Sequence, residues 1–362
     1  MDSKERALRI LNLQEADRVA FDFEVASPEV WDRLLQHYGV RTCEDILRIL
    51  HIDFRNTAVY TCAGIPPKHV GGDIYKNAWG VKFSMSMGMV VEHPLSDEAS
   101  FDDIDSYGGW LNPDEVDYMS ILENMDRSSE YAVYGGYWSP FWYIYQMLMG
   151  MDNSMVLLYE KPDVAEYLMD KILSIALEIN RRIFEKARSR MQIFYVGDDF
   201  GTQSDLQISP EMWRKFLKPR IKKLYDLATH YGYIIQQHSC GSVIKVIPDL
   251  VELGMRGLNP IQTAARDMDI RILKQRFGHC VCFNGGIDTQ TTLPFGTVED
   301  VKKEVIDRIV TLAPGGGYVL APSQSFMSDV PTQNIIAMYE TGYHYGWYDS
   351  LGKYKDVKFN EL

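Results

Sequence analysis

The sequence lacks the features of a membrane or secreted protein. It has no run of about 18 consecutive apolar residues, which is the least that a membrane-spanning helix requires. Its first residues, Met-Asp-Ser-Lys-Glu-Arg, contain none of the apolar stretch of a secretion signal. We therefore expect a cytoplasmic protein that does not contact membranes.

Cysteine and positive charge are also scarce. Five cysteines are scattered over 362 residues, an odd number that argues against a disulfide framework and leaves reduced thiols for metal or redox chemistry. Lys and Arg number 37 against 50 Asp and Glu, which gives a formal net charge of −13. Such a surface repels nucleic acid, so we expect a small-molecule substrate and no nucleic-acid partner.

No Gly-x-Gly-x-x-Gly segment follows any of the β-rich runs of the chain, which disfavours an open dinucleotide-binding sheet. These runs alternate with helical patterns, and such alternation indicates a parallel sheet built from βαβ units. Seven strands are predicted, at residues 18–24, 131–137, 192–197, 233–237, 257–260, 280–284 and 317–321. The favoured fold is a (β/α)₈ or TIM barrel of the α/β class, with one strand unassigned.

Neither a fixed-period repeat nor a low-complexity linker divides the chain, so residues 1–362 are predicted to form a single domain. Residues from about 51 to 130 interrupt the alternation with Gly, Pro, Met and aromatic residues. We interpret this elaborated N-terminal region as an insertion after the first strand. Its cluster of methionines at 84–89 is expected to serve packing, with a pocket for a flat apolar ligand as the alternative.

The most specific motif is Gln-His-Ser-Cys-Gly-Ser at 237–242, directly after the strand at 233–237. Residues i and i+2 of an extended chain point to the same side, so His238 and Cys240 can converge on one ion. Zinc accepts both ligand types, and barrel enzymes place functional groups at the carboxyl ends of strands. The alternative is a buried histidine beside an inert thiol, but a polar turn between hydrophobic elements is costly unless its groups are satisfied. The motif therefore suggests a zinc site.

Three carboxylates are candidate catalytic residues. Asp198 and Asp199 follow the strand at 192–197 and would face the same barrel mouth. Their proximity could raise one pKa, which suits a general acid or base, and either could also complete a zinc site. Helix capping by one of them is the alternative. Glu24 ends the first strand on the same face as Asp22 and lies nearer the mouth.

Several further residues are predicted to bind substrate. Asp53 and Arg55 place a carboxylate beside a guanidinium, which is either a structural ion pair or a site for a carboxylated substrate. Tyr137 and Trp138 belong to an aromatic segment that would suit a planar guest, although packing is its default role. Asn284 precedes two glycines that allow a ligand to approach the backbone closely.

Six segments, taken in order, resemble the uroporphyrinogen decarboxylase superfamily over essentially the whole chain. They are Glu-Ala-Asp-Arg-Val at 15–19, Leu-His-Ile-Asp-Phe-Arg at 50–55, Asn-Ala-Trp-Gly-Val at 77–81, Gly-Asp-Asp-Phe-Gly at 197–201, His-Ser-Cys-Gly at 238–241 and Ala-Pro-Ser at 321–323. The resemblance implies a distorted TIM barrel. It also implies one of two chemistries: cofactor-free decarboxylation of uroporphyrinogen, or zinc-assisted methyl transfer to or from a corrinoid.

The two chemistries differ in their sequence requirements. His238-x-Cys240 is similar to the first two zinc ligands of the corrinoid-linked methyltransferases. Those enzymes usually supply a third ligand, a cysteine, in an Ala-Pro-Gly-Cys turn, where this chain has Gln324, which we assign to substrate binding. The third zinc ligand is then left to Asp198, Asp199, Glu24 or Cys282. Decarboxylases carry basic residues near the position of Phe-Asp-Phe-Glu at 21–24, and an acidic pair there would repel a polycarboxylate.

The leading hypothesis is therefore a zinc-dependent methyltransferase that moves a methyl group between a small methylated or methoxylated substrate and a corrinoid protein. The first alternative is a decarboxylase of a carboxylated tetrapyrrole or aromatic compound, in which Asp198 or Asp53 stabilises a protonated ring and Arg55 holds the carboxylate. The second is a non-catalytic corrinoid-binding or tetrapyrrole-binding protein, suggested by the absence of cysteine at position 324. The oligomeric state is open, with a homodimer as one arrangement.

Overall fold

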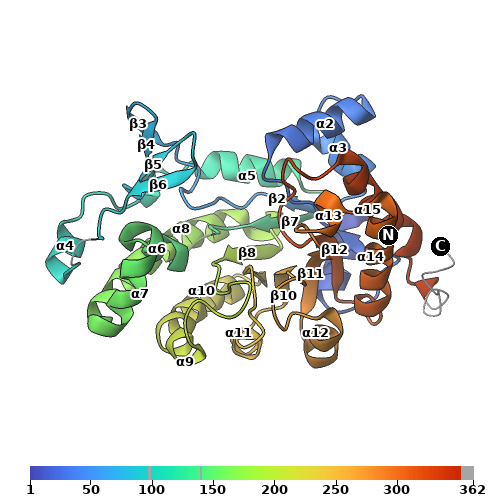
Figure 1. Ribbon diagram of the computed structural model, residues 1–362. Helices are drawn as coiled ribbons and strands as arrows, with labels where there is room; N and C mark the ends of the chain where they lie inside the picture. Colours follow the sequence, from blue (N-terminus) through green and yellow to red (C-terminus); the bar gives the residue numbers. More distant parts are fainter. Residues whose placement is uncertain (97–98, 139–140, 352–362) are drawn as a thin grey trace.

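The computed structural model describes residues 1–96, 99–138 and 141–351 (Figure 1). Within these residues, eight parallel strands form one sheet in the order β1-β12-β11-β10-β9-β8-β7-β2. The strands are β1 (Ala20–Phe21), β2 (Phe54–Asn56), β7 (Ala132–Gly135), β8 (Ile193–Gly197), β9 (Ile234–His238), β10 (Gly257–Ile261), β11 (Cys282–Ile287) and β12 (Tyr318–Pro322). The backbone N–H of Asp53 donates to the carbonyl of Phe21 at 2.9 Å, which brings the two edge strands together. The sheet is thus a nearly closed barrel, and the predicted TIM fold is confirmed.

Seven barrel strands lie where the sequence predicts them, and the eighth is β2. It falls inside the region 51–130 that was interpreted as an insertion, so this region begins with a barrel strand. Three residues are too few to show an alternating pattern, which is why β2 was missed. The rest of the region holds a second, antiparallel sheet, which projects away from the barrel beside α6 (Figure 1). Its strands are β3 (Lys68–Gly71), β4 (Ile74–Lys76), β5 (Lys82–Ser84) and β6 (Met89–Glu92).

Amphipathic helices cover the outside of the barrel (Figure 1). The longest, α8 (Pro162–Ala187), starts with proline and buries one apolar face, as its sequence pattern predicts. Helix α11 (Ile247–Leu253) holds Pro248 in its first turn, where proline is tolerated. The other helices are α1 (Ser3–Leu11), α2 (Pro28–Tyr38), α3 (Cys43–Ile49), α4 (Phe101–Ser106), α5 (Tyr118–Arg127), α6 (Trp142–Met149), α7 (Met151–Glu160), α9 (Pro210–Met212), α10 (Lys218–His230), α12 (Ile270–Phe277), α13 (Thr292–Phe295), α14 (Val298–Leu312) and α15 (Thr332–Tyr345). Short 3₁₀ or π turns lie at Pro113–Glu115, Arg188–Arg190 and Trp213–Leu217. Across the described part of the chain, no helix is both long enough and apolar enough to cross a bilayer.

Helix α1 closes the amino-terminal end of the barrel. Its apolar residues Ala7, Ile10 and Leu11 pack in one cluster with inward-facing residues of the strands, among them Phe54 and Cys282. A separate, larger cluster fills the space between the strands and the outer helices. Because one end of the barrel is filled by α1, the carboxyl ends of the strands are the end that remains for a functional site.

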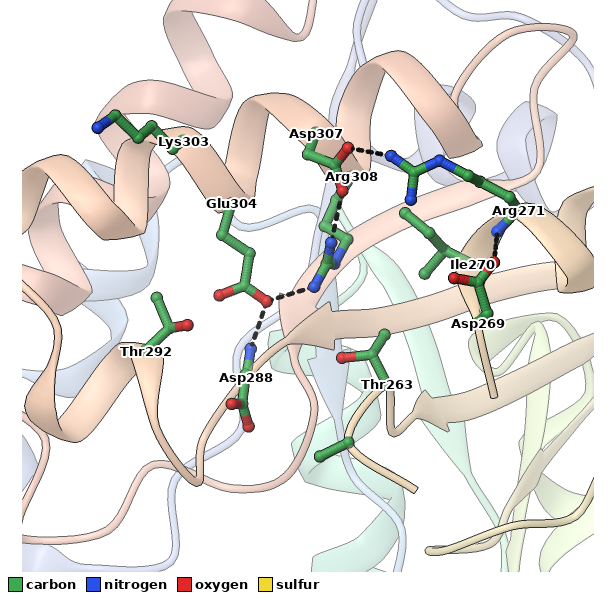
Figure 2. Close-up of a pocket in the computed structure, with 11 residues that line it drawn as sticks. Thr263, Asp269, Ile270, Arg271, Asp288, Thr292, Lys303, Glu304, Asp307 and Arg308 are labelled. Atoms are coloured by element: carbon green, nitrogen blue, oxygen red, sulfur yellow. Dashed lines mark hydrogen bonds and ion pairs between the residues drawn. The ribbon is translucent and has the colours of Figure 1, made fainter. Parts of the chain in front are cut away.

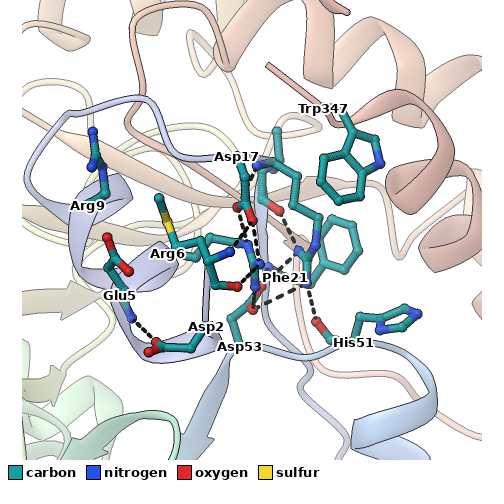
Figure 3. A network of polar contacts seen from close by, with 12 residues as sticks. Asp2, Glu5, Arg6, Arg9, Asp17, Phe21, His51, Asp53 and Trp347 are labelled. Atoms are coloured by element: carbon teal, nitrogen blue, oxygen red, sulfur yellow. Dashed lines mark hydrogen bonds and ion pairs between the residues drawn. The ribbon is translucent and has the colours of Figure 1, made fainter. Parts of the chain in front are cut away.

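A buried ion-pair network fastens α1 to the barrel (Figure 3). The carboxylate of Asp53 is fully buried and accepts hydrogen bonds from Arg6 at 2.7 Å, from Arg18 at 2.9 Å and from the backbone N–H of Phe21 at 2.9 Å. Arg6 also donates to Asp17 at 2.6 Å. Asp53 therefore joins α1, the start of β1 and the start of β2 at the seam of the barrel.

Candidate metal centre

The loops that follow β8 and β9 bring Asp199, His238 and Cys240 together. The two strands pair with Gly197 opposite His238, so the residues two positions further along each strand also emerge side by side. One ligand atom from each of the three residues lies within 4.8 Å of the other two. His238 Nε2 is 3.6 Å from Cys240 Sγ and 3.7 Å from Asp199 Oδ1. The predicted convergence of His238 and Cys240 is thus present, and Asp199 is the carboxylate that joins them.

Two glycines allow these loops to pack backbone against backbone. A Cβ atom on Gly241 would lie 2.5 Å from the carbonyl oxygen of Thr202, and one on Gly201 would lie 2.7 Å from that of Cys240. Gly241 also has a φ of +82°, a conformation that residues with a side chain rarely adopt. The backbone N–H of Cys240 donates to Asp199 Oδ1 at 2.8 Å and ties the loops together. The two glycines therefore allow the loops that carry the three ligand atoms to lie close together.

The imidazole of His238 is fixed in orientation by two neighbours that the sequence did not suggest. Its Nδ1 lies 2.7 Å from Asn259 Oδ1 and 2.9 Å from the hydroxyl of Tyr195, which itself donates to Asn259 Oδ1 at 2.8 Å. An acceptor at Nδ1 places the ring proton there and leaves the lone pair of Nε2 facing Cys240 and Asp199. This is the arrangement that commonly supports a metal-bound histidine. Alternation along the strands at 192–197 and 257–260 could have placed Tyr195 and Asn259 on the inner face.

The spacing of the three ligand atoms fits zinc. Bonds of about 2.0–2.1 Å to nitrogen and about 2.3 Å to sulfur, at a tetrahedral angle, separate the two ligand atoms by about 3.5 Å. The observed separation between Nε2 and Sγ is 3.6 Å. One nitrogen, one sulfur and one carboxylate oxygen also form a donor set that zinc accepts, and three protein ligands leave a position for substrate, as in catalytic zinc sites.

The surroundings of Cys240 raise the pKa of its thiol. Burial raises its pKa well above the usual range, and the negative charge of Asp199 raises it further. The Gln324 amide lowers the pKa of this thiol, because it donates a hydrogen bond to Sγ at 2.8 Å. The Oε1 atom of Gln324 accepts from the backbone N–H of Ser325 at 2.9 Å. A bound cation would reverse this balance, because a coordinated thiol loses its proton. Gln324, which was assigned to substrate binding, therefore lies directly against the candidate ligand.

Asp198 has a different role from its neighbour. Its carboxylate accepts hydrogen bonds from the backbone N–H groups of Trp142 at 3.1 Å and Tyr143 at 2.8 Å, at the start of α6. Burial, followed by the charge of Asp199, raises its pKa to about 7. The structure does not bring Asp198 to the three ligand atoms, and helix capping is the role that its contacts show.

A second polar cluster lies inside the barrel around Asp22. One oxygen of its carboxylate accepts from the Asn284 amide at 2.9 Å and from the Tyr134 hydroxyl at 3.0 Å. Burial raises the pKa of Asp22 to about 6, and the charge of Glu24 adds to the shift. Asn284 is therefore a partner of Asp22, and Tyr134 is a third member that was not among the predicted site residues.

The shifted pKa of Asp22 predicts a stability effect that depends on pH. Well below pH 4 the carboxyl is protonated in both the folded and unfolded states, whereas above about pH 6 the folded protein carries a partly desolvated charge that the unfolded chain solvates freely. The variant Asp22→Asn should therefore raise the free energy of unfolding by about 1–2 kcal/mol at pH 8 and by no more than about 0.5 kcal/mol at pH 4. Urea denaturation at both pH values measures the gain, with exposed Asp32→Asn as the matched control. An equal gain at both values would contradict the assignment.

Three residues predicted to bind substrate lie away from the metal centre. Asp53 and Arg55 flank the start of β2, at the opposite end of the barrel from His238. Asp53 belongs to the network described above, and Arg55 pairs with Glu44 at 2.8 Å. Tyr137 is fully buried and donates to the carbonyl of Thr61 at 2.7 Å. These contacts correct the predictions, because each of the three polar groups is satisfied within the protein.

Trp138 and Glu24, by contrast, lie near the centre. The Trp138 ring meets that of His238 edge on, with centroids 5.2 Å apart. The Glu24 carboxylate is close enough to Cys240 for its charge to help raise the pKa of the thiol. Cys282, the reserve ligand, is buried in the α1 cluster and is not part of the ligand group.

A charged cavity of about 550 Å³ lies elsewhere, between α12, α14 and the ends of β10 and β11 (Figure 2). Its charged side chains largely pair with one another: Arg308 with Glu304 at 2.6 Å, and Arg271 with Asp307 at 2.7 Å. Asp288, also on its wall, accepts from the backbone N–H of Gln290 at 2.8 Å. The cavity contains none of the three candidate ligands.

Comparisons with known proteins show a family and a fold for this chain. The sequence model of uroporphyrinogen decarboxylase (URO-D) matches residues 75–345. Among solved structures, a methyltransferase from Methanosarcina mazei has a TM-score of 0.65 at 19% identity, covering 95% of this chain and 99% of its own. Xylanase 10B from Thermotoga maritima has a TM-score of 0.41 at 12% identity, covering 71% and 86%. A search of curated proteins found no match. The similarity to the first structure shows a shared fold.

Proposed function

Because the chain belongs to the uroporphyrinogen decarboxylase family, we propose that it is a zinc-dependent methyltransferase, acting between a small methylated or methoxylated substrate and a corrinoid on a partner protein. The observation that carries the proposal is the meeting of Asp199, His238 and Cys240 at distances that suit zinc. The fold shared with the Methanosarcina mazei methyltransferase supports it. The proposal includes the cytoplasmic location and the single domain expected from the sequence.

Each residue of the centre has a role in this proposal. His238 Nε2, Cys240 Sγ and the Asp199 carboxylate would hold the zinc ion. When bound, zinc supplies a Lewis acid that lowers the pKa of a thiol or hydroxyl group or polarises a methyl donor. Asn259 and Tyr195 keep the imidazole in the ligand orientation. Gln324, which contacts Cys240 Sγ, and Trp138, which contacts the ring of His238, would then border the substrate.

The decarboxylase alternative has less support. It requires cationic side chains to hold a substrate with many carboxylates, and Arg55 lies at the other end of the barrel. Within the described residues, no lysine or arginine pairs with Asp22, Glu24 or Asp199. Acidic groups without cationic partners would repel a polycarboxylate.

Methyl transfer to free cob(I)alamin tests the proposal. The zinc-loaded protein is incubated with cob(I)alamin and, separately, methanol, a methoxylated aromatic, a methylated amine and a methylated sulfide. The cobalt(I) electron pair takes the methyl group, the leaving atom keeps the bonding pair and binds a proton, and the corrinoid spectrum reports the change. We expect turnover with at least one donor, and its loss after chelation of zinc. Carbon dioxide release from uroporphyrinogen without any methyl transfer would refute the proposal.

The two residues that hydrogen-bond to His238, Asn259 and Tyr195, should strengthen zinc binding although they are not ligands. Replacing Asn259 by alanine, or Tyr195 by phenylalanine, removes a group that orients the imidazole, and we expect zinc to bind about 10-fold to 100-fold more weakly. Competition with a chromophoric chelator measures the affinity. The control is Tyr233→Phe, which removes a buried hydroxyl bonded to the carbonyl of Arg188 at 3.1 Å, far from the centre. Unchanged zinc affinity in both test variants would contradict the assigned orientation.

A further inference from the structure

We propose that the substrate of this centre carries its methyl groups on a positively charged atom, as methylated ammonium and sulfonium compounds do. The inference rests on the proposed function for the place where the substrate binds. It narrows the substrate from methylated compounds in general to cations. Its basis is the sign of the charges around the centre together with the side chains that accompany them.

The charged groups around the centre are of one sign. The Asp199 side chain is 45% exposed, and both Asp22 and Glu24 are half-buried. The backbone carbonyl of Glu24 accepts from the N–H of Phe326 at 2.8 Å, two residues beyond Gln324, whose amide contacts Cys240 Sγ at 2.8 Å. In the described parts of the chain, no side chain donates a hydrogen bond or forms an ion pair with the Glu24 carboxylate. Among the residues that the structure describes, the negative charge of the centre therefore has no cationic partner.

Zinc alone does not cancel this charge. A zinc ion bound by the thiolate of Cys240 and the carboxylate of Asp199 is neutral with its ligands, since two negative charges meet two positive ones. The charge of Glu24, and that of Asp22 when it is ionised, remain. A cationic substrate would neutralise them, whereas a neutral methyl ether would leave them unpaired and an anionic substrate would be repelled.

A buried hydrogen-bond acceptor that has no donor also favours a cationic substrate. Asn284 is fully buried, and its amide NH₂ is committed to Asp22 at 2.9 Å and to the Tyr134 hydroxyl at 3.2 Å. Its Oδ1 has no hydrogen-bond partner among the described residues. The amide cannot be reversed, because the carboxylate of Asp22 requires the NH₂ group. The cluster beside the centre thus has more acceptors than donors, which suits a ligand that brings positive charge.

Aromatic side chains complete the recognition of a cation. The rings of Tyr60 and Trp138 lie with centroids 5.2 Å apart and planes inclined by 56°. Trp138 in turn contacts the ring of the candidate ligand His238. Burial raises the pKa of the Tyr60 phenol to about 12, and the charge of Glu24 adds to this shift. Inclined aromatic faces next to a carboxylate are the groups that recognise methylated ammonium through cation–π attraction.

Equilibrium binding to the zinc-loaded full chain tests the inference without requiring turnover. The probes are choline and its neutral isostere 3,3-dimethyl-1-butanol, which has a carbon in place of the charged nitrogen. Isothermal titration should show choline binding at least about tenfold more tightly, with an affinity that falls as salt is added. Glu24→Gln should remove most of this preference, while Glu299→Gln on α14 should leave it intact. Tyr60→Leu, at an exposed position, should also reduce it.

The outcomes separate this inference from the proposed function. Equal binding of the two probes, or a choline preference that survives in both Glu24→Gln and Tyr60→Leu, would overturn the inference. Methyl transfer from neutral ethers without any choline preference would also overturn it, while the proposed function would stand. A choline preference in a protein that transfers no methyl group from any donor would support the cation site and refute the methyltransferase.

Discussion

Replacing Asp53 by alanine is expected to lower the free energy of unfolding by about 3–5 kcal/mol, because it leaves buried charges without their partner. The guanidinium groups of Arg6 and Arg18 are nearly inaccessible, and both donate to this carboxylate. The backbone N–H of Phe21 would also lose its acceptor. Urea denaturation followed by circular dichroism measures the loss. We expect the same fold in the variant at low denaturant, because the remaining contacts of the barrel are unchanged.

An exposed ion pair provides the control for this prediction. Lys222 and Asp226 lie one turn apart on α10 and are each more than half exposed. Lys222→Ala should therefore change stability by no more than about 0.5 kcal/mol. If Asp53→Ala lowered the free energy of unfolding as little as Lys222→Ala does, the junction between β1 and β2 would not depend on the buried ion-pair network. If it removed zinc binding at full stability, Asp53 would belong to the functional site after all.

Removing the imidazole of His238 should have the largest effect on the metal. The free energy of binding a structural zinc ion is about 10–16 kcal/mol over four ligands, so the loss of one ligand is expected to weaken binding by at least about 100-fold. Cys240→Ser should produce a loss of the same order. Metal analysis after dialysis against a weak chelator measures both variants. The fold should persist, since His238 and Cys240 lie at the end of a strand whose backbone pairs on both sides.

Matched controls exist nearby in the sequence. His279 is exposed and Cys280 is half-buried, and neither belongs to the ligand group. The variants His279→Ala and Cys280→Ser should keep the zinc content of the parent protein. Full zinc occupancy in His238→Ala would show that the metal is held elsewhere.

The barrel could be predicted from the sequence because its strands are buried and apolar. Seven runs show this directly, whereas β2 contributes only three residues and was hidden in the irregular region that follows it. The convergence of His238 and Cys240 could also be predicted, because it depends only on the two-residue period of an extended chain. Both features are local, and local patterns are what a single sequence reveals.

The choice between adjacent residues could not be predicted. Asp198 and Asp199 are neighbours, yet one caps α6 and the other faces the loop after β9, a difference fixed by the register of β8 against β9. Tyr137 and Trp138 likewise point in opposite directions, one into the core and one towards His238. These outcomes depend on elements distant in the sequence.

The structural role of Asp53 also could not be predicted from the sequence. Beside Arg55, its sequence context fits a structural ion pair and a substrate site equally well. The partners that decide between them, Arg6 and Arg18, lie 47 and 35 positions away along the chain. Arg55 pairs with Glu44 instead of Asp53. Long-range pairing of charges leaves no periodic signal in a sequence.

X-ray absorption at the zinc edge, on protein purified without added metal, shows whether Cys240 binds a zinc ion. We expect about one zinc ion per chain, with a single sulfur neighbour at about 2.3 Å and nitrogen or oxygen neighbours at about 2.0–2.2 Å. The sulfur signal should disappear in Cys240→Ser. A protein that takes up no zinc even when the ion is supplied, or one whose zinc has no sulfur neighbour, would rule out a zinc centre at Asp199, His238 and Cys240.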